Sequence, residues 1–267
     1  MLKKILTSLG GGAGAAPARP AASPIEEVLL RQIVEARAQD PLIGARIASK
    51  EILRRLGNML ATDTGVHAES LFCALGALAG YACQTAVRAQ ATARGVTPAT
   101  LLPPSQEADG RTYYRSGSVD ALLAETQSAV WCMLMDGARQ AGFETLPDVG
   151  ELFHHVAGSI GTPEFGKPRQ RGPRAPRDLP FLYLRAQWPA FQPMVMKFCS
   201  APDQWPVAYA YAIQEALQRY RQQFEPGAAA ALAMECAIAM SRIDFATHGQ
   251  ASTPLQSRSK AATLATP

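Results

Sequence analysis

Two short groups of histidine and glutamate could together hold a metal ion. Glu151 and His154 have Glu-x-x-His spacing, which places both side chains on one face of a helix. His67 and Glu69 are two residues apart and share no helix face, so they need ligands from elsewhere. If the two pairs lie opposite one another, imidazole and carboxylate groups would form a single-metal site. Helical bundles that bind two iron ions use Glu-x-x-His twice, and this chain has it once.

The alternative for both groups is purely structural. His67 and Glu69 would then form a capping turn with a partly buried histidine, and the helix with Glu151 would carry one exposed and one half-buried histidine. Since histidine is common in both roles, the spacing leaves the two interpretations open.

The strongest concentration of charge is a proline-rich segment between Pro163 and Pro180. Arginine guanidinium groups fit phosphate oxygens, and proline limits the entropy that a loop loses on binding. No aromatic residue is interleaved, so we expect non-specific phosphate contact rather than base stacking. The alternative is a solvated surface loop. The candidate anion-binding residues are Lys167, Arg169, Arg171, Arg174 and Arg177.

Familiar catalytic motifs are missing from the sequence. Gly161 to Lys167 has the spacing of a phosphate-binding loop, but Pro168 stands where that motif needs a serine or threonine hydroxyl. There is no G-x-S-x-G elbow, no dinucleotide-binding glycine fingerprint and no C-x-x-C pair. The sequence therefore identifies neither a catalytic residue nor a cofactor.

The elements that must position these residues are helices. Capping residues and apolar periodicity predict an all-α fold, a single globular domain of about seven helices spanning residues 23–244. The segment 181–200 contains Pro189 and Pro193, so we expect short or kinked helices there. The predicted helices cover about 23–38, 41–60, 64–94, 118–142, 147–160, 203–224 and 228–244, with loops at 97–117 and 161–180.

A small-residue motif in the third predicted helix indicates close packing. Gly76 and Gly80 form a G-x-x-x-G pair within the apolar run 71–83, and such a pair lets two helix axes approach closely. We interpret it as a helix-packing interface, either a crossing point inside the fold or the seam of a homodimer. The run is too short to span a membrane by itself.

Bulk composition describes a globular chain with a sizeable core. Of 267 residues, 48% are hydrophobic and 18% are charged, and the net charge of +4 does not by itself imply a nucleic-acid partner. Aromatic residues make up 7% and alanine is abundant, which favours helix over sheet. The five cysteines are odd in number and widely spaced, so we expect reduced thiols in a cytoplasmic protein.

The two ends are expected to lie outside the folded domain. Residues 1–22 combine a leader with a Gly, Ala and Pro linker, and residues 245–267 are small and polar, which is typical of a disordered tail. Leu2, Ile5, Leu6 and Leu9 have helical spacing beside Lys3 and Lys4, so peripheral membrane contact is a weaker hypothesis. The plainer interpretation is a frayed leader.

Two functions from different classes follow. The leading hypothesis is a cytoplasmic helical binding or interaction protein, self-associating as a homo-oligomer, whose arginine-rich loop meets an anionic partner: nucleic acid, nucleotide or acidic protein. The alternative is an enzyme with a metal or small-molecule site between helices, built on His67, Glu69, Glu151 and His154.

Overall fold

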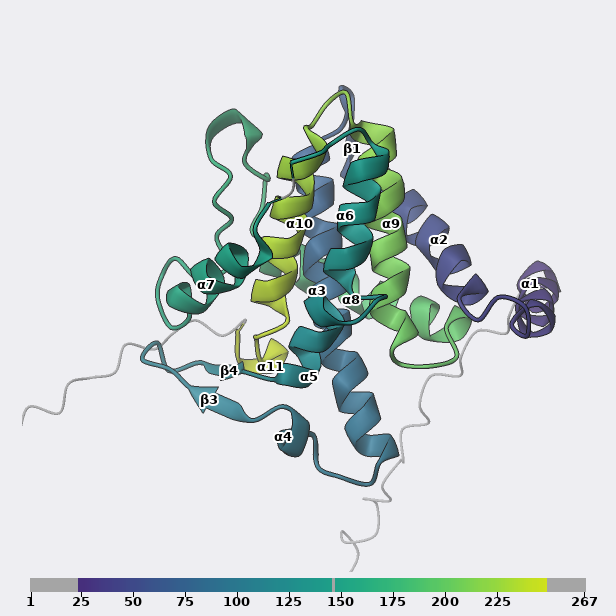
Figure 1. Ribbon diagram of the computed structural model, residues 1–267, viewed down its shortest axis with the longest axis horizontal. Helices are drawn as coiled ribbons and strands as arrows, with labels where there is room; N and C mark the ends of the chain where they lie inside the picture. The colour runs from purple at the N-terminus through teal and green to yellow at the C-terminus, as the bar shows by residue number, and fades with distance from the viewer. Residues whose placement is uncertain (1–23, 146, 249–267) are drawn as a thin grey trace, which may run out of the picture.

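The computed structural model describes residues 24–145 and 147–248, of which 67% are helical and 5% are in strands (Figure 1). The predicted all-α class is confirmed, although the described chain has more helices than the seven expected. The longer helices are α1 (Pro24–Ala36), α2 (Ile43–Leu60), α3 (Ala68–Ala93), α6 (Val130–Gln140), α7 (Val149–Ser159), α8 (Pro180–Phe198), α9 (Gln204–Tyr220) and α10 (Pro226–Met240).

Shorter elements lie between them. Within the described residues there are two antiparallel pairs of strands, β1 (Ala61–Thr62) with β2 (Gly65–Val66), and β3 (Pro104–Gln106) with β4 (Thr112–Tyr114). The second pair lies within residues 97–117, where the sequence predicts a loop. The remaining elements are α4 (Pro98–Leu101), α5 (Gly117–Asp120), the π-helix η1 (Ala121–Glu125), the 3-10 turn η2 (Gly172–Arg174) and α11 (Phe245–His248).

Helix α3 is the centre of the fold. Helices α8, α9 and α10 pack on it, α2 and α6 pack on α9, and α7 packs on α10 (Figure 1). By length and composition α3 could cross a membrane, with a mean hydropathy of 1.4, and 89% of that window is buried inside the fold. That degree of burial is what a core helix requires, and it is the role that α3 has here.

The predicted G-x-x-x-G pair lies against α10 of the same chain. A Cβ atom at Gly76 would overlap the carbonyl oxygen of Ala233, and one at Gly80 would overlap that of Ala237. Both glycines are buried, so the two helix backbones meet along this line. A homodimer seam through these two glycines is therefore unavailable, because α10 already occupies the position.

Two helices do not begin where the sequence predicts. The third helix begins at Ala68 rather than at Thr64, because β1 and β2 form a tight hairpin whose Gly65 has a φ of +100°. The predicted helix at 118–142 is broken into α5, η1 and α6, and Ser116 rather than Ser118 caps α5. Its expected end is confirmed, since Gly142 has a φ of +90° after α6.

The segment around Pro189 and Pro193 is one continuous helix, α8, and not several short ones. Each internal proline costs about 3 kcal/mol of helix stability. Burying a large apolar side chain returns about 1.5–3 kcal/mol, and α8 buries several, so core packing outweighs the local penalty. The buried apolar side chains of α8 include Leu184, Trp188, Phe191, Met194 and Val195.

The folded part also extends past its predicted end. Helix α10 stops at Met240 rather than at residue 244, and the chain then forms α11. The His248 ring packs against Phe181, with ring centroids 4.7 Å apart, so the predicted tail begins too early. The expectations for the leader, the linker and the rest of the tail lie outside the described residues.

Candidate functional site

His67 caps the start of α3. Its Nδ1 lies 2.9 Å from Ser70 Oγ and accepts the Ser70 backbone N–H at 3.4 Å, while its Nε2 lies 3.3 Å from Glu69 Oε2. Both ring nitrogens therefore contact neighbours within the first turn of the helix. This is the capping turn that the structural interpretation expects.

The other two candidate metal ligands lie in separate surroundings. Glu151 Oε1 accepts a hydrogen bond from Arg169 Nη1 at 2.7 Å, and His154 is exposed on α7 beside a surface hollow. In the part of the chain that the structure describes, no group of three or more His, Cys, Asp or Glu side chains could hold a metal ion. The four residues 67, 69, 151 and 154 thus do not assemble as the predicted metal site.

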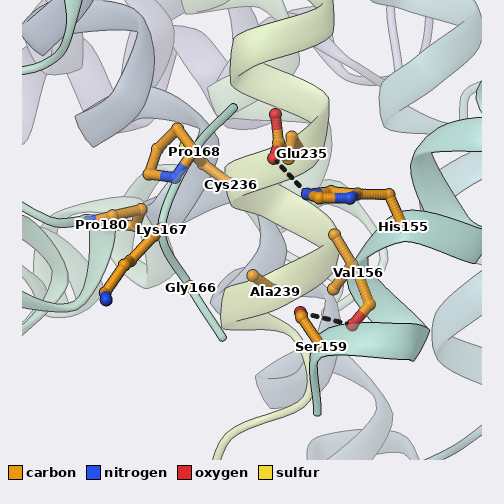
Figure 2. A pocket seen from close by; sticks show the side chains of 10 residues that line it. All are labelled: His155, Val156, Ser159, Gly166, Lys167, Pro168, Pro180, Glu235, Cys236 and Ala239. Atoms are coloured by element: carbon orange, nitrogen blue, oxygen red, sulfur yellow. Dashed lines mark hydrogen bonds and ion pairs between the residues drawn. The ribbon is translucent and has the colours of Figure 1, made fainter. Parts of the chain in front are cut away.

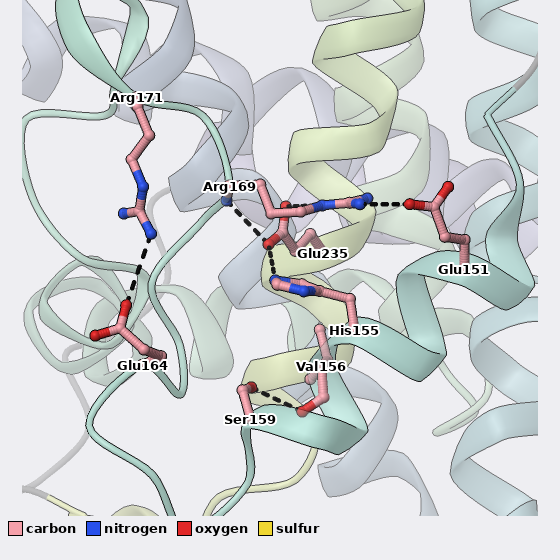
Figure 3. Close-up of polar contacts among 8 residues, drawn as sticks. All are labelled: Glu151, His155, Val156, Ser159, Glu164, Arg169, Arg171 and Glu235. Atoms are coloured by element: carbon pink, nitrogen blue, oxygen red, sulfur yellow. Dashed lines mark hydrogen bonds and ion pairs between the residues drawn. The ribbon is translucent and has the colours of Figure 1, made fainter.

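A buried carboxylate that the sequence did not single out takes the central position. Glu235 lies on α10 and is only 5% exposed. Its Oε1 accepts the backbone N–H of Arg169 at 3.0 Å and lies 3.2 Å from His155 Nε2, as Figure 3 shows. The Arg169 side chain passes Glu235, with Nε 3.8 Å from Oε2, before it reaches Glu151.

Burial is the dominant influence on the Glu235 carboxyl group. It raises the pKa, while the Arg169 backbone N–H and the neighbouring His155 and Arg169 side chains oppose that shift. A charged Glu235 is tolerated because the loop supplies a hydrogen-bond donor and the Arg169 guanidinium lies nearby. Through this hydrogen bond Glu235 ties residues 167–177, here called the arginine loop, to the core.

The space around Glu235 is too small for a substrate. Figure 2 shows a pocket between α7, α10 and the arginine loop, lined by His155, Lys167, Glu235 and Cys236 among others. Its volume is about 10 Å³, enough for roughly one water molecule. Cys236 Sγ lies 3.6 Å from Cys73 Sγ, both thiols are free, and burial raises the pKa of Cys236, so it is held as the thiol.

The five basic residues of the arginine loop divide into two groups. Lys167 Nζ lies 3.0 Å from Glu164 Oε1, and Arg169 contacts Glu151 and Glu235. Arg171, Arg174 and Arg177 are exposed; Arg171 has a long 3.7 Å contact with Glu164. Within the described residues, the side chains of Arg174 and Arg177 have no acidic partner.

Sequence reasoning missed Glu235 although a signal was present. It is the only charged residue between Pro226 and Met240, in a helix that is otherwise apolar. A lone carboxylate on a helix that is buried on most sides must find a partner inside the protein.

No protein-family model, no curated protein and no solved structure matches the chain.

Proposed function

We propose that the chain is a binding protein that contacts a phosphate-bearing polyanion through Arg171, Arg174 and Arg177. The observation that carries the proposal is the attachment of the arginine loop near both ends. The Arg169 backbone N–H donates to Glu235 at 3.0 Å, and the Arg177 backbone N–H donates to Ser70 Oγ at 3.0 Å.

Attachment near both ends favours binding. A loop that is already held loses less conformational entropy when its side chains meet a ligand. The two attachment points lie eight positions apart in sequence, and Arg174, between them, has no acidic partner in the described part of the chain. Arg174 is exposed and lies in the short turn Gly172–Arg174.

The guanidinium groups of the three arginines favour a phosphate group over a small monatomic anion. Each guanidinium offers two parallel N–H donors that match two phosphate oxygens, and it stays charged at every physiological pH. Lys167 and Arg169, also expected to bind anions, contribute less because Glu164, Glu151 and Glu235 already neutralise them. Because only three arginines of the loop lack a close acidic partner among the described residues, we expect the protein to contact few phosphates. The slope of log Kd against log salt should then not exceed about 2.7, at about 0.9 per phosphate on duplex DNA.

The test replaces the three available arginines and leaves Arg169 in place. We expect wild type to bind a short labelled DNA duplex at low salt, and Arg171→Ser/Arg174→Ser/Arg177→Ser to bind at least about tenfold more weakly. The matched control replaces three exposed arginines elsewhere that have no acidic partner among the described residues, Arg94, Arg185 and Arg221, and should change the affinity by less than about twofold.

Fluorescence anisotropy measures these affinities. If wild type shows no binding at low salt, or the loop variant binds as well as the control, the proposal is wrong. Binding of a polyglutamate peptide with no binding of DNA would reject the phosphate assignment and point to an acidic protein partner.

A further inference from the structure

A larger hollow lies on the other side of α7 from the arginine loop. Its volume is about 410 Å³, within the roughly 300–1,000 Å³ typical of small-molecule sites. Val156 lines both this hollow and the small pocket beside Glu235, so α7 separates the two. The apolar part of its wall comes from α7, the residue after it and α10, and consists of Phe153, Val156, Ala157, Ile160 and Ile238.

A nearly buried arginine forms part of the same wall. The Arg242 side chain is 8% exposed, pairs with Asp120, and lies with its guanidinium carbon 5.8 Å from the centre of the Phe153 ring. A guanidinium has five N–H donors, and among the described residues Asp120 is the one hydrogen-bond acceptor of this side chain. Arg242 therefore has donors available and is held in place by packing.

The charges around the hollow favour an anion. Its lining contains two arginines, Arg115 and Arg242, against one acidic residue, Asp120, with His154 exposed beside them. Arg115 lies 3.0 Å from Glu107, but its side chain is 60% exposed, so solvent weakens that pair. An acceptor group entering the hollow would meet the N–H donors of Arg242 that Asp120 leaves free, where low exposure strengthens the attraction, together with the exposed cation of Arg115.

We propose that this hollow binds a small organic anion with an apolar body, of the class of medium-chain carboxylates. The carboxylate would lie toward Arg242 and Arg115, and the hydrocarbon chain would cover Phe153, Ile160 and Ile238. A few convergent polar groups on a mainly apolar wall are the usual composition of such sites. This site is separate from the phosphate contacts proposed for the arginine loop.

The first test fills the hollow from a position that does not belong to the core. Ala157 is exposed on α7 and lines the hollow, so Ala157→Trp should occlude it without overpacking the interior. By isothermal titration calorimetry with decanoate, we expect this variant to bind at least about tenfold more weakly than wild type. Ala93→Trp, at the exposed end of α3, is the matched control and should change the affinity by less than about twofold.

The second test changes the charge. Arg115→Glu should weaken decanoate binding at least about fivefold, while Arg219→Glu should leave it within about twofold. The control is close, because Arg219 is similarly exposed, at 53%, and also pairs with a glutamate. Arg242→Lys keeps the positive charge but removes the planar fork, so we expect weaker binding by this variant as well.

The results of these titrations test the site and its preference for an anion separately. Decanoate binding that Ala157→Trp and Arg115→Glu weaken, with both controls unaffected, supports the site. No binding by wild type, or equal binding by wild type and Ala157→Trp, overturns it. Decanol that binds as tightly as decanoate overturns the assignment of an anion. If Arg242→Lys does not fold, the Ala157 and Arg115 variants still decide the matter, since both residues are exposed.

Discussion

The backbone N–H of Arg169 donates to the buried carboxylate of Glu235 at 3.0 Å, which ties an exposed basic loop to the core helix α10. Sixty-six positions separate the two residues in sequence. The contact uses the main chain of the loop, so the attachment does not consume the Arg169 side chain, which continues to Glu151. Glu235 thus holds the loop in place, and the exposed arginine side chains of the loop stay available for other contacts.

The first prediction concerns this attachment. Glu235→Ala removes the buried acceptor of the part-buried Arg169 backbone N–H, so we expect it to lower the free energy of unfolding by about 1–3 kcal/mol. We also expect faster trypsin cleavage after Arg171 and Arg174, because the loop opens more often. Glu235→Gln is the matched control: its side-chain carbonyl can still accept from Arg169, so cleavage should stay near the wild-type rate. Equal cleavage of the two variants would argue against the attachment.

The second prediction compares the same substitution at two helical glycines. Gly80→Ala places a Cβ atom against the Ala237 carbonyl oxygen, and overpacking of this kind costs about 1–3 kcal/mol. Gly57, within α2, has no atom near the position of its missing Cβ, and Gly57→Ala should stabilise by about 0.5–1 kcal/mol. Urea denaturation measures both. Shifts of the same sign would show that α3 and α10 do not meet at Gly80.

The third prediction concerns pH. Burial, with Arg111 nearby, lowers the pKa of His248 to about 4, against an opposing effect of Asp109. The unfolded chain binds this proton at a pKa of about 6.5 and the native chain only near 4. The stabilising contribution of His248 is therefore fully present above about pH 6.5 and is lost as the pH falls toward 4.

Thermal unfolding between those two pH values tests this prediction. We expect the melting temperature of wild type to fall more steeply with acidification than that of His248→Phe, which keeps an aromatic ring beside Phe181 but cannot be protonated. Parallel curves for the two proteins would show that His248 is not buried as a neutral ring. The comparison cancels the carboxyl groups that titrate in the same range.

Local signals in the sequence were sufficient for many helix ends. Asp148 caps α7 through the Gly150 backbone N–H, and Gly95 and Gly142 stop helices with positive φ angles, as their residue types indicate. The prediction of one helix over 118–142 was wrong, and so was the expectation of short helices around Pro189. Both depend on packing against distant elements, which helix propensity does not contain.

For the candidate sites, too, local sequence signals identify some residues, and contacts between distant elements decide the rest. The basic loop stands out by its composition, and Glu151 and His154 by their spacing. Which histidine faces the core, and that Glu235 meets His155, depends on how α7 packs on α10, a contact between residues far apart in sequence. Arg242 falls inside the predicted helix 228–244 but lies in the turn after α10, and its contact with Asp120 from α5 joins residues far apart in sequence.

The last prediction tests what holds Arg242 beside the hollow. Gln84, fully buried on α3, donates through Nε2 to the carbonyl oxygens of Ser241 at 3.0 Å and Ile243 at 2.9 Å, the residues that flank Arg242. Gln84→Met keeps a similar volume but leaves both bonds unmade, so we expect a loss of about 2–4 kcal/mol in unfolding free energy and weaker decanoate binding. Gln140→Met, at the exposed end of α6, is the control. Undiminished decanoate affinity in Gln84→Met would mean that Gln84 does not position Arg242.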